Sequence, residues 1–213
     1  MTPATVFDLD GTLTDSLDLV TGSYIDTIRE FGGPTVTPEE IEAIWHLGPT
    51  PVVMEHFLGR PTPAAVSRFV ERIATSSAQV RPFPGVVQLL GTLAELGHSL
   101  GVVTNATRAN ADAVLAASGL DQLIDTIVCA DEAKPKPAPD GLLSIIESLG
   151  STPTESVYIG DSWYDLACAA TAGVRAIHAT WAADGNCTLT HPHECVPDLA
   201  LILRGWPTPD RAV

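Results

Sequence analysis

From residue 86 onward, short apolar runs of strand length alternate with amphipathic segments of helix length. This alternation is typical of βαβ units, which build a mainly parallel sheet covered by helices. A first strand-like run ends at Gly11, and further runs follow at 99–104, 126–129, 157–160 and 174–178. Helical spacing marks the segments between them, at 86–96, 110–117, 140–149 and 165–172. The sequence therefore predicts an α/β core.

The segment between the first predicted strand and this core differs from the core, because it carries only helical signals. Apolar residues recur at helical spacing from Ser16 to about Phe31. Thr37-Pro38-Glu39-Glu40 combines an N-cap residue, a first-turn proline and a capping-box acid, which marks a second helix start. Two more helices are expected at 51–58 and 63–78, before the proline-rich connection Arg81–Gly85. We predict a core from 1–15 and 85–213, interrupted by an all-helical cap domain at 16–84.

The composition limits the classes of partner. The 213 residues are 45% hydrophobic, enough for a large buried core, and 26 acidic against 11 basic residues give a net charge of −15. Nucleic acid and anionic membrane surfaces would be repelled, and no apolar run of about 18 residues or basic leader segment occurs. We therefore expect a cytoplasmic chain with neither partner, while its oligomeric state stays open. The four cysteines contain no CxxC pair, as expected of reduced thiols.

Two acidic residues stand at the end of the first predicted strand. Asp8 and Asp10 are two positions apart, so their side chains emerge on the same face of a strand. Carboxylates so close repel one another unless one is protonated or a metal ion neutralises them, and Mg²⁺ fits such oxygen ligands. The alternative is that Asp10-Gly11 makes only a turn and Asp8 lies on the surface.

Polar residues also follow the other predicted strands. They are Thr104 and Asn105, Lys134 and Lys136, and Asp161 and Asp165. The carboxyl ends of parallel strands meet at one edge of a sheet, where ligands of open α/β sheets bind. Lys134 and Lys136 are the only lysines, and the prolines around them stiffen the backbone. An ammonium held near carboxylates suits binding of a phosphoryl group, whereas solvated loop lysines are the alternative.

Four ordered segments resemble the motifs of the haloacid dehalogenase superfamily: Phe7–Asp15, Val102–Asn105, Lys136–Pro139 and Gly160–Asp165. The resemblance extends from Phe7 to about Ala172 and includes the place of the helical cap. It implies a Rossmann-like three-layer core and an enzyme of the phosphoric monoester hydrolase type. The cap loop Trp45–Thr50 is similar to that of the phosphoglycolate phosphatase and pyrophosphatase branches.

The resemblance also implies a role for each matching residue. Asp8 would be the nucleophile that accepts the phosphoryl group, and Asp10 the general acid and base. Asp8, the backbone carbonyl of Asp10, and Asp161 would hold Mg²⁺, with Asp165 a further ligand or an acid behind the ligands. The remaining predicted contacts bind the phosphoryl group or the substrate: Thr104, Lys136, Asn105, the backbone amides of Gly11 and Thr12, and His46 of the cap.

Other chemistries of the superfamily fit less well. The acid Asp10 argues against dehalogenation, and the absence of lysine between Ser16 and Pro84 argues against a Schiff-base phosphonatase. A phosphosugar mutase would carry a histidine where this chain offers Asp18, although His46 and His56 keep that alternative open. We expect hydrolysis of a small phosphorylated metabolite, phosphoglycolate-like or a sugar phosphate, with a catalytically idle binding or regulatory protein as the other alternative.

One segment lies outside the motifs. Cys187, His191, His193 and Cys195 are soft ligands near one another in sequence, but their spacing matches no common zinc motif. We expect this segment to be a loop with partly buried cysteines, and the alternative of a structural zinc site stays open.

Overall fold

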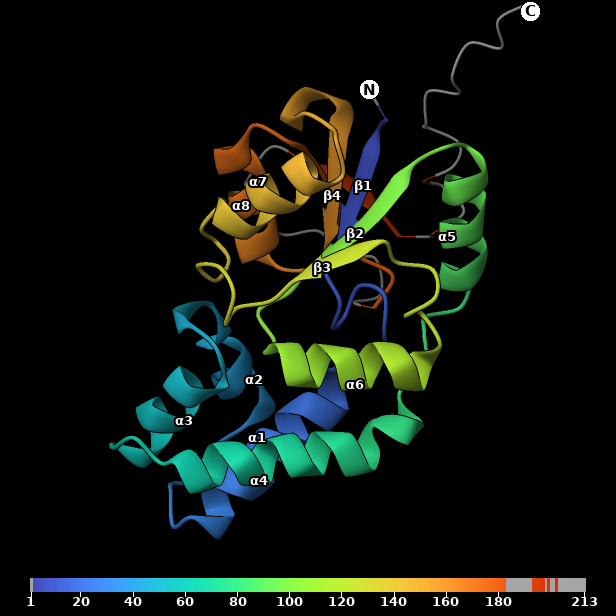
Figure 1. Cartoon of the computed structure of the whole chain (residues 1–213). Helices are drawn as coiled ribbons and strands as arrows, with labels where there is room; N and C mark the ends of the chain where they lie inside the picture. The colour runs from blue at the N-terminus through green and yellow to red at the C-terminus, as the bar shows by residue number, and fades with distance from the viewer. Residues whose placement is uncertain (1, 183–192, 198, 200–201, 203–213) are drawn as a thin grey trace, which may run out of the picture.

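The computed structural model describes residues 2–182, 193–197, 199 and 202 (Figure 1). Within these residues six strands form one parallel sheet in the order β3-β2-β1-β4-β5-β6. The strands are β1 (Ala4–Phe7), β2 (Ser99–Val103), β3 (Thr126–Val128), β4 (Ser156–Gly160), β5 (Arg175–Ala179) and β6 (Glu194–Val196). The predicted α/β sheet is confirmed. The segment after the fifth strand was predicted to be a loop. That prediction is wrong at β6, whose three residues show no clear alternation of polar and apolar side chains.

Each face of the sheet contributes to a different apolar core, because successive side chains of a strand point to opposite faces. Val6 and Tyr158 pack with α7 (Asp140–Ser148) and α8 (Trp163–Ala172), whereas Phe7 and Ile159 belong to the core that includes α5 (Val86–Glu95) and α6 (Arg108–Ser118). Figure 1 shows α7 and α8 on one side of the sheet and α5 on the other. These layers confirm the Rossmann-like core.

The helices predicted between the first strand and residue 85 are present. They are α1 (Leu17–Glu30), α2 (Pro38–Glu42), α3 (Thr50–Leu58) and α4 (Pro63–Ser76); a 3-10 turn at Trp45–Leu47 lies between α2 and α3, and another at Ser77–Gln79 follows α4. A capping box of Thr37 and Glu40 starts α2, as predicted. The rings of Tyr24 on α1 and Phe69 on α4 stack with centroids 4.1 Å apart. The helices gather at the lower end of the molecule in Figure 1, and the division at 16–84 stays a prediction.

The chain passes between the sheet and these helices through two segments that lie side by side. Thr14 pairs with Pro82 in an antiparallel bridge. The Asp15 amide donates to the Arg81 carbonyl at 2.9 Å, and the Phe83 amide donates to the Leu13 carbonyl at 3.0 Å. This pairing brings the predicted Arg81–Gly85 connection against the segment after β1.

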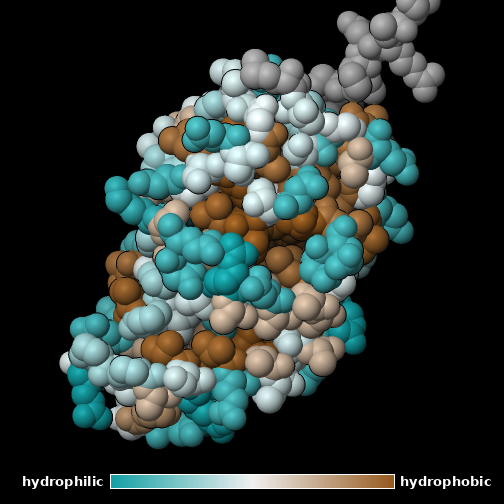
Figure 2. All heavy atoms as spheres, viewed as in Figure 1, coloured by the Kyte–Doolittle hydropathy of each residue, from teal (hydrophilic) through white to brown (hydrophobic). Residues whose placement is uncertain are grey.

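The surface in Figure 2 is mostly hydrophilic, with apolar side chains gathered near β3 at the edge of the sheet. Among the described residues, no helix combines the length and the apolar character that a membrane crossing requires. The cytoplasmic location stays a prediction.

Candidate active site

Three predicted site residues follow neighbouring strands. Asp8 comes directly after β1, Thr104 after β2 and Asp161 after β4. Because β1 pairs in parallel with β2 on one side and β4 on the other, these residues lie at one edge of the sheet. The strand order changes direction at β1, which is where open α/β sheets bind ligands.

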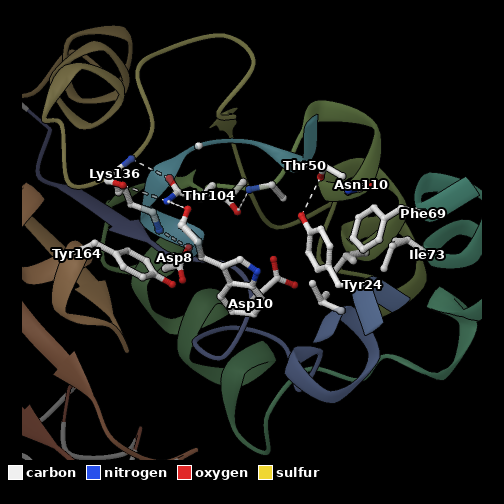
Figure 3. A pocket seen from close by; sticks show the side chains of 16 residues that line it. Asp8, Asp10, Tyr24, Thr50, Phe69, Ile73, Thr104, Asn110, Lys136 and Tyr164 are labelled. Atoms are coloured by element: carbon white, nitrogen blue, oxygen red, sulfur yellow. Dashed lines mark hydrogen bonds and ion pairs between the residues drawn. The ribbon is translucent and has the colours of Figure 1, made fainter. Parts of the chain in front are cut away.

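Lys136 lies at the centre of this edge, with its side chain only 1% exposed (Figure 3). Its ammonium donates to Asp8 Oδ1 at 2.5 Å and to Asp165 Oδ1 at 2.7 Å. The Tyr158 hydroxyl lies 3.1 Å from the same nitrogen and donates to Asp165 Oδ1 at 2.9 Å. The predicted nucleophile is therefore held in a buried network of opposite charges.

Burial and charge shift the pKa values of this network in opposite ways. Burial raises the pKa of the Asp8 carboxyl well above its usual range; the Lys136 charge opposes this increase, and the Asp165 and Asp161 charges add to it. Burial alone would lower the pKa of the Lys136 ammonium, but the charges of Asp165 and Asp8 bring it above its ordinary value. Lys136 therefore stays protonated and offsets much of the negative charge.

Asn105 fixes the backbone that carries Lys136. Its Oδ1 accepts from the Lys136 amide at 2.8 Å, and its Nδ2 donates to the Lys136 carbonyl at 3.1 Å. Nδ2 also lies 3.4 Å from the Trp45 carbonyl in the turn before α3. Both polar ends of the Asn105 side chain contact backbone of this chain, and its predicted contact with substrate stays a prediction.

The Asp10 side chain points away from the lysine and accepts a hydrogen bond from Ser16 Oγ at 2.5 Å. Ser16 Oγ lies 3.0 Å from the Thr14 hydroxyl, which donates to the Leu9 carbonyl at 3.2 Å. Burial raises the pKa of Asp10, against the effect of the Ser16 hydrogen bond. A carboxyl that tends to hold its proton is suited to protonate a leaving oxygen.

The loop after β1 requires glycine directly after Asp10. Gly11 has φ +84°, and a Cβ there would come within 2.7 Å of Asp161 Oδ2. The next residue, Thr12, donates its hydroxyl to Asp161 Oδ1 at 2.9 Å, and its carbonyl accepts from the Trp181 indole at 3.0 Å. The loop after β1 is thus packed directly against the loop after β4.

Three carboxylates could share a cation. One oxygen each of Asp8, Asp161 and Asp165 lies within 4.8 Å of the others. Burial, then the charge of Asp165, raises the pKa of Asp161 to about 7, so a positive ion would relieve an unfavourable site. An all-oxygen, negatively charged set fits Mg²⁺. The Asp10 side chain is not part of this cluster, and only its backbone carbonyl was predicted as a ligand.

A pocket extends from these acids toward the helices between residues 17 and 76. Its polar end is lined by Asp8, Asp10, Thr104, Asn105 and Lys136. Its other end is lined by residues of α1, α3, α4 and α6: Val20, Tyr24, Thr50, Phe69, Ile73, Asn110 and Val114 (Figure 3). Trp45, Gly48, Ala106 and Tyr164 complete the wall.

Two other predicted residues lie apart from the pocket lining. His46 faces Trp163, with ring centroids 5.2 Å apart. Lys134 is 76% exposed and pairs with Asp140 at 3.2 Å, which supports a role as surface charge rather than in substrate binding.

Sequence reasoning missed Tyr158 and Ser16, because an ordinary strand tyrosine and a helix N-terminal serine carry no signal of their own.

The cysteine-containing segment differs from expectation. Cys195 is disulfide-bonded, so the expectation of four reduced thiols is wrong there, whereas Cys129 and Cys168 are free. His193 and Cys195 lie near His178, whose Nε2 is 2.9 Å from the Asp161 carbonyl oxygen. Cys187 and His191 lie outside the described residues. A cysteine in a disulfide offers no thiolate, so the zinc alternative gains no support.

Comparison with known protein families shows to which family this chain belongs. The family described as "Haloacid dehalogenase-like hydrolase" matches residues 5–179. The chain belongs to the haloacid dehalogenase-like hydrolase family. Its relatives include the "Probable phosphatase IndB" of Dickeya dadantii, which is 34% identical and aligned over 85% of this chain and 82% of its own. A "Phosphoglycolate phosphatase" of Agrobacterium fabrum is 31% identical, with the same coverages.

A solved structure shares this fold. CbbY from Rhodobacter sphaeroides, in complex with phosphate, superposes with a TM-score of 0.81 and 23% identity, over 94% of this chain and 96% of that one. The predicted resemblance to haloacid dehalogenase-like hydrolases is confirmed, and so is the predicted enzyme class, a phosphoric monoester hydrolase of this type.

Proposed function

We propose that this hydrolase is a Mg²⁺-dependent phosphatase that releases phosphate from a small phosphorylated metabolite through an aspartyl phosphate on Asp8. The observation that carries the proposal is the polar end of the pocket. Two acids, Asp8 and Asp10, line this end together with Thr104 and Lys136. The names of the phosphatase relatives support the same reaction.

In the first step an Asp8 carboxylate oxygen attacks phosphorus and the bond to the leaving oxygen breaks. Asp10, whose pKa burial raises, gives its proton to that oxygen. Lys136 and Thr104 bind the phosphoryl oxygens, where the fixed ammonium stabilises negative charge. Ser16 holds the Asp10 side chain in place through its short hydrogen bond.

In the second step Asp10, now ionised, takes a proton from water, which attacks phosphorus. The bond between phosphorus and the Asp8 oxygen breaks, and the carboxylate is restored. Mg²⁺, held by Asp8, Asp161 and the Asp10 carbonyl, would supply positive charge beside the transferred group. Asp165 engages one oxygen with Lys136 and Tyr158 and the other with Ser162, so we assign it the positioning of the lysine.

The alternatives from the sequence gain no support. Neither His46 nor His56 lines the pocket, so neither cap histidine is placed to serve a phosphosugar mutase. An idle binding protein would not need an acid, a nucleophile and a cation around one cavity.

The test is phosphate release from a panel of phosphoglycolate, sugar phosphates, nucleoside monophosphates, phosphoserine and pyrophosphate. We expect release with Mg²⁺, loss on chelation and recovery on adding Mg²⁺ back. Asp8→Asn should lower kcat by at least about 1,000-fold with the fold intact by circular dichroism. Full activity in Asp8→Asn or in chelated enzyme would overturn the proposal.

A further inference from the structure

The far end of the pocket is apolar and uncharged. Val20 and Tyr24 of α1, Phe69 and Ile73 of α4, and Val114 of α6 form its wall. Since the phosphoryl group belongs at Asp8 and Lys136, this wall faces the leaving group. A wall of aliphatic and aromatic side chains favours a leaving group with apolar surface.

No second cation reaches this wall. Among the described residues, Lys136 is the only basic side chain that lines the pocket, and its ammonium is engaged by Asp8 and Asp165. The arginines between residues 17 and 81 are directed elsewhere. Arg29, Arg68 and Arg72 form ion pairs with acidic side chains outside the pocket, Arg81 donates to backbone carbonyls, and Arg60 is exposed.

An anionic leaving group would therefore find no basic side chain of the described residues on this wall. A carboxylate or second phosphate at the far end would lose its water without a compensating charge on the wall, which is costly. The same charge distribution does not oppose an uncharged group.

The apolar wall contains one polar atom without a partner. Asn110 is 6% exposed, lines the pocket, and its Oδ1 has no hydrogen-bond partner among the described residues. A buried carbonyl oxygen in that state is costly unless a ligand donates to it. Thr50, whose hydroxyl accepts from Tyr24 at 3.1 Å, still has its own proton to donate.

We infer that the substrate is a phosphomonoester of an uncharged alcohol with an apolar body and a hydroxyl or N–H group that donates to Asn110. The inference rests on the proposed phosphatase function and names its substrate class. Of the two predicted substrates it disfavours phosphoglycolate, whose leaving group carries a carboxylate, whereas a sugar phosphate meets the requirement for an uncharged leaving group but lacks the apolar body.

The first experiment compares size-matched substrates with the wild-type enzyme and Mg²⁺. One pair is 4-(hydroxymethyl)benzyl phosphate and 4-carboxybenzyl phosphate, and the other is 2-hydroxyethyl phosphate and phosphoglycolate. We expect kcat/KM to be at least about tenfold higher for the uncharged member of each pair. A smaller ratio, or a reversed one, in either pair would overturn the inference.

The second experiment tests the hydrogen bond to Asn110. Wild-type enzyme should prefer 4-(hydroxymethyl)benzyl over 4-ethylbenzyl phosphate, and Asn110→Leu should reduce this preference by at least about fivefold while still hydrolysing the ethyl compound. An unchanged preference for the hydroxymethyl compound would show that Asn110 does not recognise the substrate. If Asn110→Leu does not fold, Asn110→Ser, which withdraws the carbonyl at smaller volume, replaces it.

The two proposals fail in different ways. Hydrolysis of the carboxylate compounds as fast as their partners would contradict the substrate class and leave the phosphatase standing. No phosphate release from any compound, with folded protein, would overturn the phosphatase and the substrate class together.

Discussion

Lys136 occupies a position where an ammonium is difficult to replace, since its neighbours are two buried acids, Asp8 and Asp165. Removing one partner of such a cluster leaves uncompensated charge. We expect Lys136→Met to lower the free energy of unfolding by about 3–5 kcal/mol and to abolish phosphate release. Urea denaturation and the phosphate assay measure the two effects.

Lys134 provides the matched control, because it is an exposed lysine two residues away. Its pair with Asp140 is solvated, so Lys134→Met should change stability by less than about 0.5 kcal/mol and leave activity intact. Equal effects of the two substitutions would contradict the assignment of Lys136 as the buried charge of the site.

Gly11 has a positive φ and also lies close to Asp161. Gly97 has the same φ without a close neighbour, so comparing the two positions separates backbone strain from steric contact. Both have φ +84°, but only at Gly11 would a Cβ meet Asp161; at Gly97 nothing lies within 4 Å. We expect Gly11→Ala and Gly97→Ala each to cost about 1–2 kcal/mol in urea denaturation, from backbone strain. Only Gly11→Ala should also lower kcat, by about tenfold or more, as Asp161 is displaced. Unaltered turnover in Gly11→Ala would show that this contact does not matter.

At the level of helices and strands, the sequence predicts most of the core because each signal is local. The capping box at Thr37 and the strand end at Asp8 require only a few neighbouring residues. β6 was missed since three residues carry no periodicity, and its pairing with β5 is decided by contacts distant in sequence.

The polar end of the pocket could be predicted, whereas its far wall could not. Asp8 and Thr104 directly follow strands, and Lys136 lies in the loop between β3 and α7. Asn110 and Phe69, by contrast, look like ordinary helix residues and meet only because α4 packs against α6. Their role depends on how helices from two parts of the chain are arranged.

His98, directly before β2, links the free energy of unfolding to pH. Burial lowers its pKa below the usual 6.5, and Nδ1 lies 3.0 Å from the Thr5 hydroxyl on β1. The unfolded chain binds a proton near pH 6.5 before the folded chain does, so the stabilisation is present above that pH and is lost as pH falls below it. We expect the free energy of unfolding to fall more steeply between pH 7 and 5.5 in wild type than in His98→Gln. Parallel curves from urea denaturation would contradict this.

Because the whole molecule carries a net charge of −15, any cation can stabilise it by screening, and specific binding of Mg²⁺ must be distinguished from that effect. Saturating Mg²⁺ at about 100 times its dissociation constant should raise the thermal midpoint by about 5–10 °C, because it binds only the folded carboxylate cluster. Sodium chloride of equal ionic strength controls for general screening. Asp161→Asn should remove the excess effect of Mg²⁺ over sodium, and an excess that persists in this variant would place the ion elsewhere.

The most direct measurement is a search for the phosphoryl group on Asp8. With 4-nitrophenyl phosphate the leaving group needs no proton, so Asp10→Asn should still form the aspartyl phosphate but should be slow to hydrolyse it, since its base is gone. We expect a burst of nitrophenol close to one equivalent of enzyme and, after acid quench, a mass increase of one phosphoryl group on the peptide that contains Asp8. Turnover without a burst, or a phosphoryl group on another residue, would contradict covalent catalysis by Asp8.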